Sequence, residues 1–84
     1  MNKARREDLL DVVDLLDDAI VRLEEIRDEE MDAFDAMPEG LQYSSRGASM
    51  QEAIDILDGF GEALADIQQQ ITNYAQPNKK SKKA

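Results

Sequence analysis

The sequence predicts an all-α fold, an antiparallel two-helix hairpin that pairs with a second copy into a dimeric four-helix bundle. Three observations carry this prediction: two long segments with apolar residues three and four positions apart, a short segment containing proline and glycine between them, and apolar faces wider than one partner helix covers. We expect one domain over residues 1–76, with helices over about 4–37 and 49–75 and a loop over 38–48. Residues 77–84, rich in lysine, are expected to form a disordered basic tail.

The first helical segment carries an apolar stripe, and Pro38 ends it because proline has no backbone N–H to donate and disfavours helical geometry in the residue before it. Leu10, Leu15 and Val21 lie outside the main stripe, so they widen the apolar face and favour a second contact surface. The stripe residues that we expect to form the core or the self-association surface are Leu9, Val13, Leu16, Ile20, Leu23 and Phe34.

The second helical segment has an apolar seam that alternates three and four residues apart from Met50 to Tyr74, which is the spacing of a heptad repeat. Ile54 and Ile56 flank this seam and widen it. The seam residues that we expect to form the core or the self-association surface are Leu57, Phe60, Leu64, Ile67 and Ile71.

Two local signals refine the second segment. Ser49 and Glu52 have the spacing of a capping box, so we expect the helix to begin at Ser49. Gly59 and Gly61 bracket Phe60, and each costs ~1 kcal/mol relative to alanine in a helix interior. We therefore expect close approach of the two helices beside the ring, or a local bend.

The charge is unevenly distributed. The chain has a net charge of −9, but all 19 acidic residues and only three bases lie between Glu7 and Asp66, a balance of −16. Such a body repels phosphates, so we expect no direct nucleic-acid binding by it and no membrane association. A basic protein is the expected partner besides a second copy, and a rod of this charge is suited to imitating DNA. The acidic surface that we expect to act is Asp11, Asp14, Asp18, Glu25, Asp28 and Asp32.

Several classes are disfavoured by composition. The chain has no cysteine and no histidine, so it has no disulfide framework and lacks the commonest metal ligand. The N-terminus is charged almost at once, and no apolar run approaches the ~20 residues of a membrane span. We expect a cytoplasmic protein, without cofactor or resident metal.

The loop over 38–48 is a second candidate binding site, for a phosphate-bearing small ligand or for a carboxylate of a partner. It supplies an aromatic face, an amide, hydroxyl groups and the only base within ~18 residues on either side. The alternative is that these residues only pack the loop, with Leu41 and Tyr43 folded over the end of the hairpin. The candidate ligand-binding residues are Gln42, Tyr43, Ser44, Ser45 and Arg46.

A second alternative is enzymatic. Glu24, Glu25 and Asp28 are followed on the next helix by Asp55 and Asp58, a pattern that resembles the Glu-Glu-x-x-Glu and Glu-x-x-Asp clusters of MazG-type nucleotide pyrophosphohydrolases. The resemblance implies a magnesium ion held by Glu25, Asp28, Asp55 and Asp58, although aspartate stands at two positions where the family has glutamate. A solvated acidic face without metal is the competing interpretation.

The segments 28–35, 37–42, 45–47 and 50–54 together resemble a group of small, mostly uncharacterised acidic helical proteins of bacteriophages and prophages. The resemblance covers residues 7–75 and implies an accessory protein of a phage or mobile element, with no implied activity. The resemblance also implies the cytoplasm of a bacterial host cell. The function predicted from the sequence is therefore a non-enzymatic acidic helical protein that acts by binding a basic host or phage protein.

Overall fold

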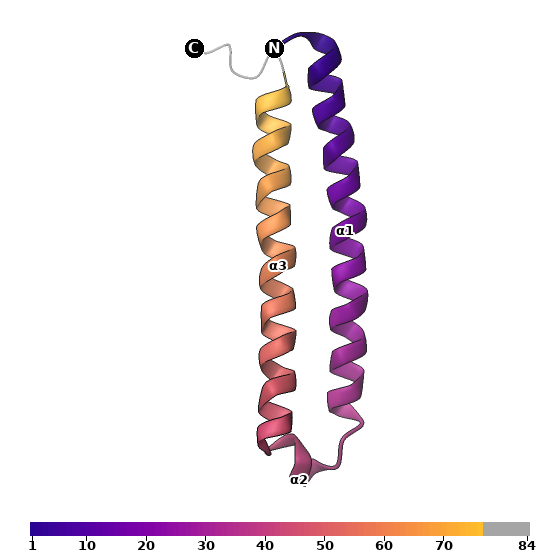
Figure 1. The fold of residues 1–84 in the computed structure, drawn as a ribbon, viewed down its shortest axis with the longest axis vertical. Coiled ribbons are helices and arrows are strands. Elements are labelled where there is room, and N and C mark those ends of the chain that lie inside the picture. Colours follow the sequence, from indigo (N-terminus) through magenta and orange to yellow (C-terminus); the bar gives the residue numbers. More distant parts are fainter. Residues whose placement is uncertain (77–84) are drawn as a thin grey trace.

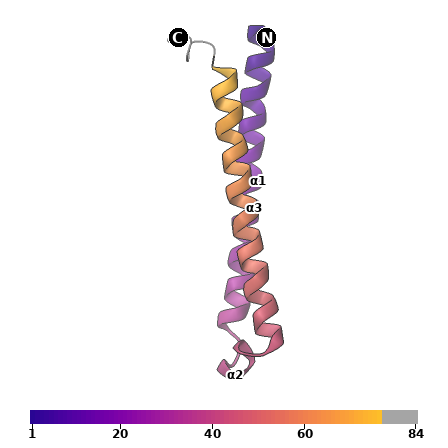
Figure 2. The same ribbon diagram turned by 90° about the vertical axis from the view of Figure 1, so that its left-hand side faces the viewer.

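The structure is a computed structural model that describes residues 1–76, in which three helices follow one another: α1 (Lys3–Asp35), α2 (Glu39–Gln42) and α3 (Ser45–Ala75). α1 and α3 lie side by side and run in opposite directions, with α2 at the turn between them (Figure 1, Figure 2). They form a thin rod of 58 × 23 × 13 Å. The predicted all-α class is confirmed, and the predicted basic tail over 77–84 lies outside the described residues.

α1 contacts α3 through one stripe of half-buried side chains, which repeats at three and four residues. Because this spacing follows one side of a helix, the stripe stays on the side that faces α3 along the whole rod. Two charged residues, Arg27 and Glu30, interrupt an otherwise apolar set. The stripe consists of Leu9, Val13, Leu16, Ile20, Leu23, Arg27, Glu30, Phe34 and Met37.

α3 contacts α1 through a seam of the same spacing, but some of the residues that form this seam differ from the predicted ones. The seam consists of Gly47, Met50, Ile54, Leu57, Gly61, Leu64, Gln68, Ile71 and Ala75. Every second position is shared with the predicted seam. Among the others, Ile54 stands in place of Ala53, and the small or polar residues Gly61, Gln68 and Ala75 stand in place of Phe60, Ile67 and Tyr74. Phe60 is 53% exposed and Ile67 is also exposed, so neither belongs to the α1–α3 core, and their role in self-association stays a prediction.

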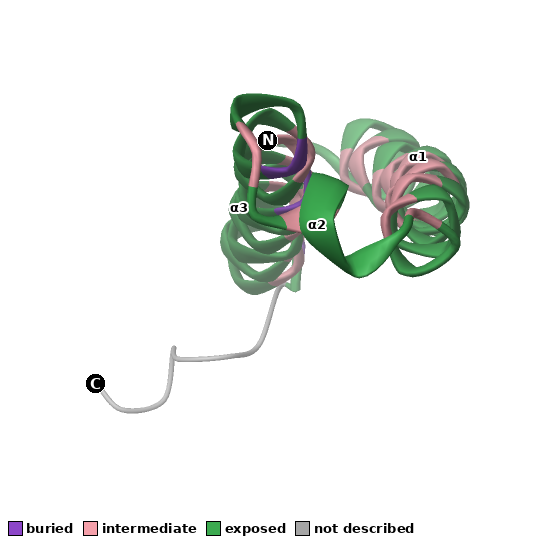
Figure 3. Cartoon of the chain, turned by 90° about the horizontal axis from the view of Figure 1, so that it is seen from below, coloured by how far each residue is buried: buried purple, intermediate pink, exposed green. Residues whose placement is uncertain are grey.

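The layer between the two helices is thin. Within residues 1–76 the apolar side chains that are buried are Ile54 and Ala75, and the rest of the seam apart from Gly47 is only half-buried. Viewed along the rod, the half-buried residues lie where α1 and α3 face each other, and the outer sides are exposed (Figure 3). Two helices in one layer leave most of their surface in contact with water, as expected for a chain of this size.

The connection is shorter than the predicted loop over 38–48, because α2 and the first turn of α3 occupy most of it. The prediction that Ser49 starts the second helix is wrong. Ser44 is the N-cap: its side chain accepts from the Gly47 N–H at 3.4 Å, and its carbonyl accepts from the Ala48 N–H at 3.0 Å. By Ser49 the backbone is already helical, so its hydroxyl has no cap to make.

Two further expectations about the chain are wrong. Tyr43 is 83% exposed and Leu41 is also exposed, so neither covers the end of the helix pair. A Cβ atom added at Gly59 or Gly61 would meet nothing within 4 Å, so the expected close approach of α1 and α3 at these glycines is wrong, and the alternative of a local bend stays a prediction. Gly47 serves close approach of α3 to α2 instead, because an added Cβ would overlap the Gln42 carbonyl oxygen.

Candidate functional site

One long side of the helix pair is apolar. In both helices, every second residue of the contact seam is followed three positions later by an apolar residue. In an antiparallel pair, these following positions of the two helices lie on the same side of the pair. We call this surface the apolar face. It consists of Val12, Leu15, Ala19, Ile26 and Ala33 of α1 and Ala53, Ile56, Phe60, Ala63, Ile67 and Tyr74 of α3.

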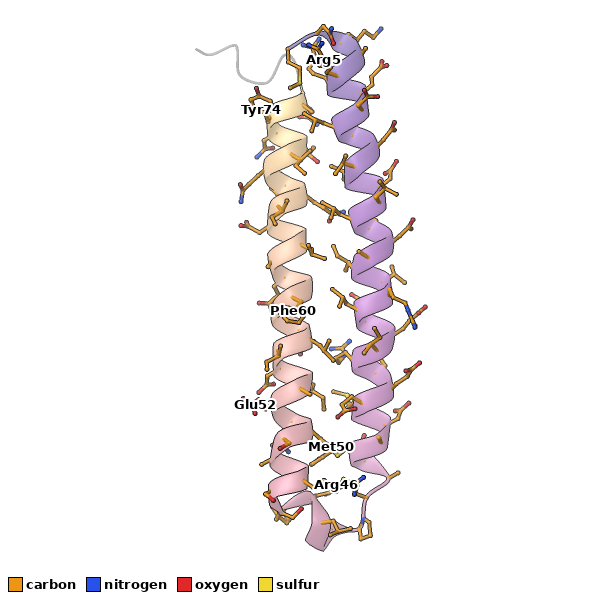
Figure 4. All side chains as sticks on the ribbon, viewed as in Figure 1. Arg5, Arg46, Met50, Glu52, Phe60 and Tyr74 are labelled. Carbon is orange, nitrogen blue, oxygen red and sulfur yellow. The ribbon has the colours of Figure 1, made fainter. Side chains whose placement is uncertain are left out.

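The large residues of the apolar face, apart from the half-buried Ile26, are open to water. Leu15 and Tyr74 are 65% and 67% exposed, and Val12, Ile56, Phe60 and Ile67 are exposed as well. Phe60 lies midway along α3, and Tyr74 lies near its C-terminal end, at the end of the rod away from α2 (Figure 4). Exposed single apolar side chains are ordinary, but a continuous strip along two helices marks an interaction surface.

The opposite side of the pair is polar and hollowed. One hollow of about 280 Å³ is lined by Ile20, Leu23, Glu24, Arg27, Leu57, Asp58, Gly61, Glu62 and Ala65. A second of about 440 Å³ is lined by Met31, Phe34, Asp35, Gln51, Ile54 and Asp55. Because Gly61 has no side chain, the seam is open at its level, and both hollows have acidic rims.

Arg27 organises the first hollow. Its Nη1 lies 2.8 Å from Asp58 Oδ1 on α3, and its Nε lies 2.9 Å from Asp28 Oδ1 on α1. The hydrogen bond to Asp28 and the negative charge of the neighbouring acids raise the pKa of Arg27 above its ordinary value. The guanidinium therefore remains charged and occupies the space between these two carboxylates.

The four acids of the proposed magnesium site are not assembled. Asp28 and Asp58 both bind Arg27, and Glu25 binds Arg22 within α1 at 3.1 Å. No group of three or more acidic side chains within residues 1–76 is arranged to hold a metal ion. The quartet of Glu25, Asp28, Asp55 and Asp58 does not fit a magnesium ion in this arrangement, since a cationic side chain stands where the two clusters meet.

The candidate loop residues divide into two kinds. Gln42 Nε2 donates to the carbonyl oxygens of Phe34 at 3.0 Å and Met37 at 3.3 Å, so it satisfies the end of α1. The Ser44 hydroxyl donates to the Leu41 carbonyl oxygen and caps α3.

The remaining loop candidates, Tyr43, Ser45 and Arg46, are exposed. The amide of Gln42 and the hydroxyl of Ser44 are used by the fold itself, which leaves these three as the free groups of the loop. Ligand binding there stays a prediction.

All six residues of the predicted acidic surface are exposed: Asp11, Asp14, Asp18, Glu25, Asp28 and Asp32. They lie on the sides of α1 that face neither α3 nor the apolar face. α3 adds exposed acids on its own outer sides, among them Glu52, Glu62 and Asp66. The rod therefore has one apolar long side, and acids over most of the rest.

These features define an all-α protein built from a two-faced antiparallel helix pair. No family model matches the chain, and no curated protein or solved structure is significantly similar to it. Within residues 1–76, no helix has the length and apolar character that crossing a membrane requires.

Proposed function

We propose that this chain is a non-enzymatic binding protein, a helical hairpin whose acidic surface binds a basic protein, as an accessory factor of a phage or other mobile element. One observation carries the proposal: the acids along the outer side of α1 are exposed, and four of the six have no ion pair within residues 1–76. The sequence resemblance to phage and prophage proteins supports the biological setting.

Charge of this kind selects partners by long-range attraction. Carboxylates held on a rigid helix repel one another, and a basic partner relieves that repulsion while releasing bound cations. Such attraction raises the association rate and falls steeply with ionic strength. The expected partner is therefore a protein with a basic groove, such as one that binds nucleic acid.

We also propose that the hairpin is one half of a dimeric four-helix bundle. The thin α1–α3 layer and the exposed apolar face support this, since a second copy would bury both. A mass of twice 9.5 kDa by light scattering is the expected result.

The dimer brings the charge density close to that of DNA. Residues 1–76 carry 19 acids and six bases, a balance of −13, so one copy along a rod of 58 Å has one net charge per ~4.5 Å, whereas two side by side have one per ~2.2 Å. Duplex DNA carries one charge per ~1.7 Å. This comparison favours imitation of DNA as the way in which the acidic surface engages a basic groove.

The test is capture from bacterial lysate on the immobilised protein. We expect a basic protein that elutes between about 50 and 500 mM salt, as screening predicts. The triple variant Asp11→Asn, Asp14→Asn, Asp18→Asn should lose it. The matched control removes three acids from α3 instead, by Glu52→Gln, Glu62→Gln and Asp66→Asn. Failure to recover any salt-sensitive basic protein, or equal loss with both variants, contradicts the proposal.

Competition separates DNA imitation from other binding. If the captured protein uses its DNA-binding groove, duplex DNA displaces the chain. Capture that is unaffected by excess DNA would contradict imitation of DNA, but not the binding of a basic protein.

A further inference from the structure

We infer that the apolar face is the docking surface for a second copy of this chain, with the two copies antiparallel, so that α1 of each lies against α1 of the other and α3 lies against α3. The inference rests on the proposed dimer and specifies its interface and orientation.

The size of the apolar face fits a second copy. From Val12 to Ala33 it extends ~32 Å at 1.5 Å per residue, and two adjacent helices make it ~20 Å wide. The face therefore offers about 640 Å² on each copy and about 1,300 Å² in all. That exceeds the largest apolar patch of a typical monomer, about 300–600 Å², and reaches the lower range of stable interfaces, about 1,200–2,000 Å².

Side-chain sizes are complementary when the copies are antiparallel. In that arrangement each helix faces its own copy and runs opposite to it, so the residue numbers of every facing pair have the same sum. With a sum of 127 in α3, Phe60 meets Ile67, and Tyr74 meets Ala53. Both aromatic rings then lie over smaller apolar side chains, which cover them.

The α1 helices pair in the same way, with a sum of 45. Val12 meets Ala33, and Ala19 meets Ile26. The α1 and α3 pairs lie at the same level of the rod, since residues that meet across α1 and α3, such as Arg27 and Asp58, add up to about 85. The interface is thus continuous for the length of the strip.

Charge favours the same orientation. The end of the rod away from α2 carries Lys3, Arg5 and Arg6, and Arg5 is seen there in Figure 4. The α2 end is acidic despite Arg46, since the chain from 28 to 39 contains six acids and no base. Antiparallel copies bring each basic end to the acidic end of the other, whereas parallel copies bring like ends together.

Spin labels test the orientation, because the chain has no cysteine and single labels are unambiguous. A label at Tyr43→Cys, beside α2, should lie about one rod length from its copy, close to the 58 Å extent. A label at Glu62→Cys, midway along α3, should lie within about 35 Å of its copy, the width of a four-helix bundle. Two short distances in a protein of dimeric mass would overturn the antiparallel orientation and leave the dimer standing.

A matched pair of variants tests the interface. Phe60→Glu, on the apolar face, should weaken the dimer at least tenfold, measured as mass against concentration. Val21→Glu is the control, because Val21 is 52% exposed, much as Phe60 is, but lies on the other side of α1. An unchanged mass with Phe60→Glu, or equal weakening by both, would overturn the interface.

Folding is followed by circular dichroism in the same samples. If Phe60→Glu loses helix, recovery of the helix at higher protein concentration counts as weakened docking. Where helix does not return, Tyr74→Glu at the end of the face decides the question by the same mass measurement. A monomeric wild-type mass at every concentration would contradict the proposed dimer and this inference together, but not the binding of a basic protein.

Discussion

Arg27 of α1 and Asp58 of α3 form the one ion pair that joins the two long helices within residues 1–76, with 2.8 Å between Nη1 and Oδ1. The same guanidinium binds Asp28 at 2.9 Å, so it bridges carboxylates from both helices. An arginine at a seam position would be costly if it were buried alone, but here its charge reaches the rim of a hollow. The pair fixes the two helices relative to each other beside Gly61, where the seam has no side chain.

Replacing Arg27 with alanine should lower the melting temperature, because two carboxylates lose their cation and the seam loses the alkyl part of the side chain. The control is Arg22→Ala, which removes an ion pair confined to α1 and should lower melting less. Both are compared by thermal unfolding at one protein concentration. An effect of Arg22→Ala as large as that of Arg27→Ala would contradict the importance of the link between helices.

The contribution of Arg27 should not depend on pH in the neutral and mildly alkaline range. Its folded pKa is raised above an ordinary value that is already high, chiefly by the hydrogen bond to Asp28. A raised pKa gives stability that is fully present below the unfolded pKa and is lost only as the pH rises through the folded one. The difference in melting temperature between wild type and Arg27→Ala should therefore be the same at pH 7 and pH 9, and a loss at pH 9 would contradict it.

The glycines of α3 should respond to alanine in opposite directions. At Gly47 the new methyl group would lie 2.0 Å from the Gln42 carbonyl oxygen, so the turn between α2 and α3 must shift, at a cost of about 1–3 kcal/mol. At Gly59 the methyl group meets open space, and helix propensity then favours alanine by about 0.5–1 kcal/mol. Urea unfolding of the two variants measures both signs, and stabilisation by Gly47→Ala would contradict the close approach.

Ser44→Ala should destabilise the protein by about 1 kcal/mol, because the α3 N-terminus loses its side-chain cap. Ser49→Ala is the matched control. It lies inside the helix and should be neutral or slightly stabilising, since alanine has the better helix propensity. Urea unfolding decides between them, and the opposite order would restore Ser49 as the start of the helix.

The all-α class and the positions of the long helices could be predicted from the sequence, because apolar residues three and four positions apart over two long segments are typical of amphipathic helices and not of strands. The seam of α3 could not. Phe60, Ile67 and Tyr74 are more apolar than Gly61, Gln68 and Ala75, so hydrophobicity alone places them in the core. Periodicity reports every apolar side of a helix, whether its own chain covers that side or leaves it open.

The candidate sites show the same limit. Exposure of the acidic surface follows from helical geometry, so the sequence predicts it well. The hydrogen bonds that Gln42 and Ser44 make to the backbone could not be predicted, because they depend on where α1 ends and α3 begins. The Arg27 bridge was also missed: an arginine in an apolar stripe signals a partner across the seam, but the sequence does not say which acid.

Gln68 is the polar member of the α3 seam, and its replacement tests how the register of the two helices is set. Its Nε2 donates to the Val13 carbonyl oxygen at 2.8 Å and to Asp17 Oδ1 at 2.8 Å. A polar residue in an apolar seam commonly fixes register at a cost in stability. Gln68→Leu should raise the free energy of unfolding by about 0.5–1 kcal/mol, because it adds apolar contact and leaves no buried donor unpaired. Gln68→Ala should lower it, since alanine fills less of the seam. Urea unfolding at one protein concentration gives both values, and a loss of stability with Gln68→Leu would mean that these hydrogen bonds outweigh the apolar contact that leucine supplies.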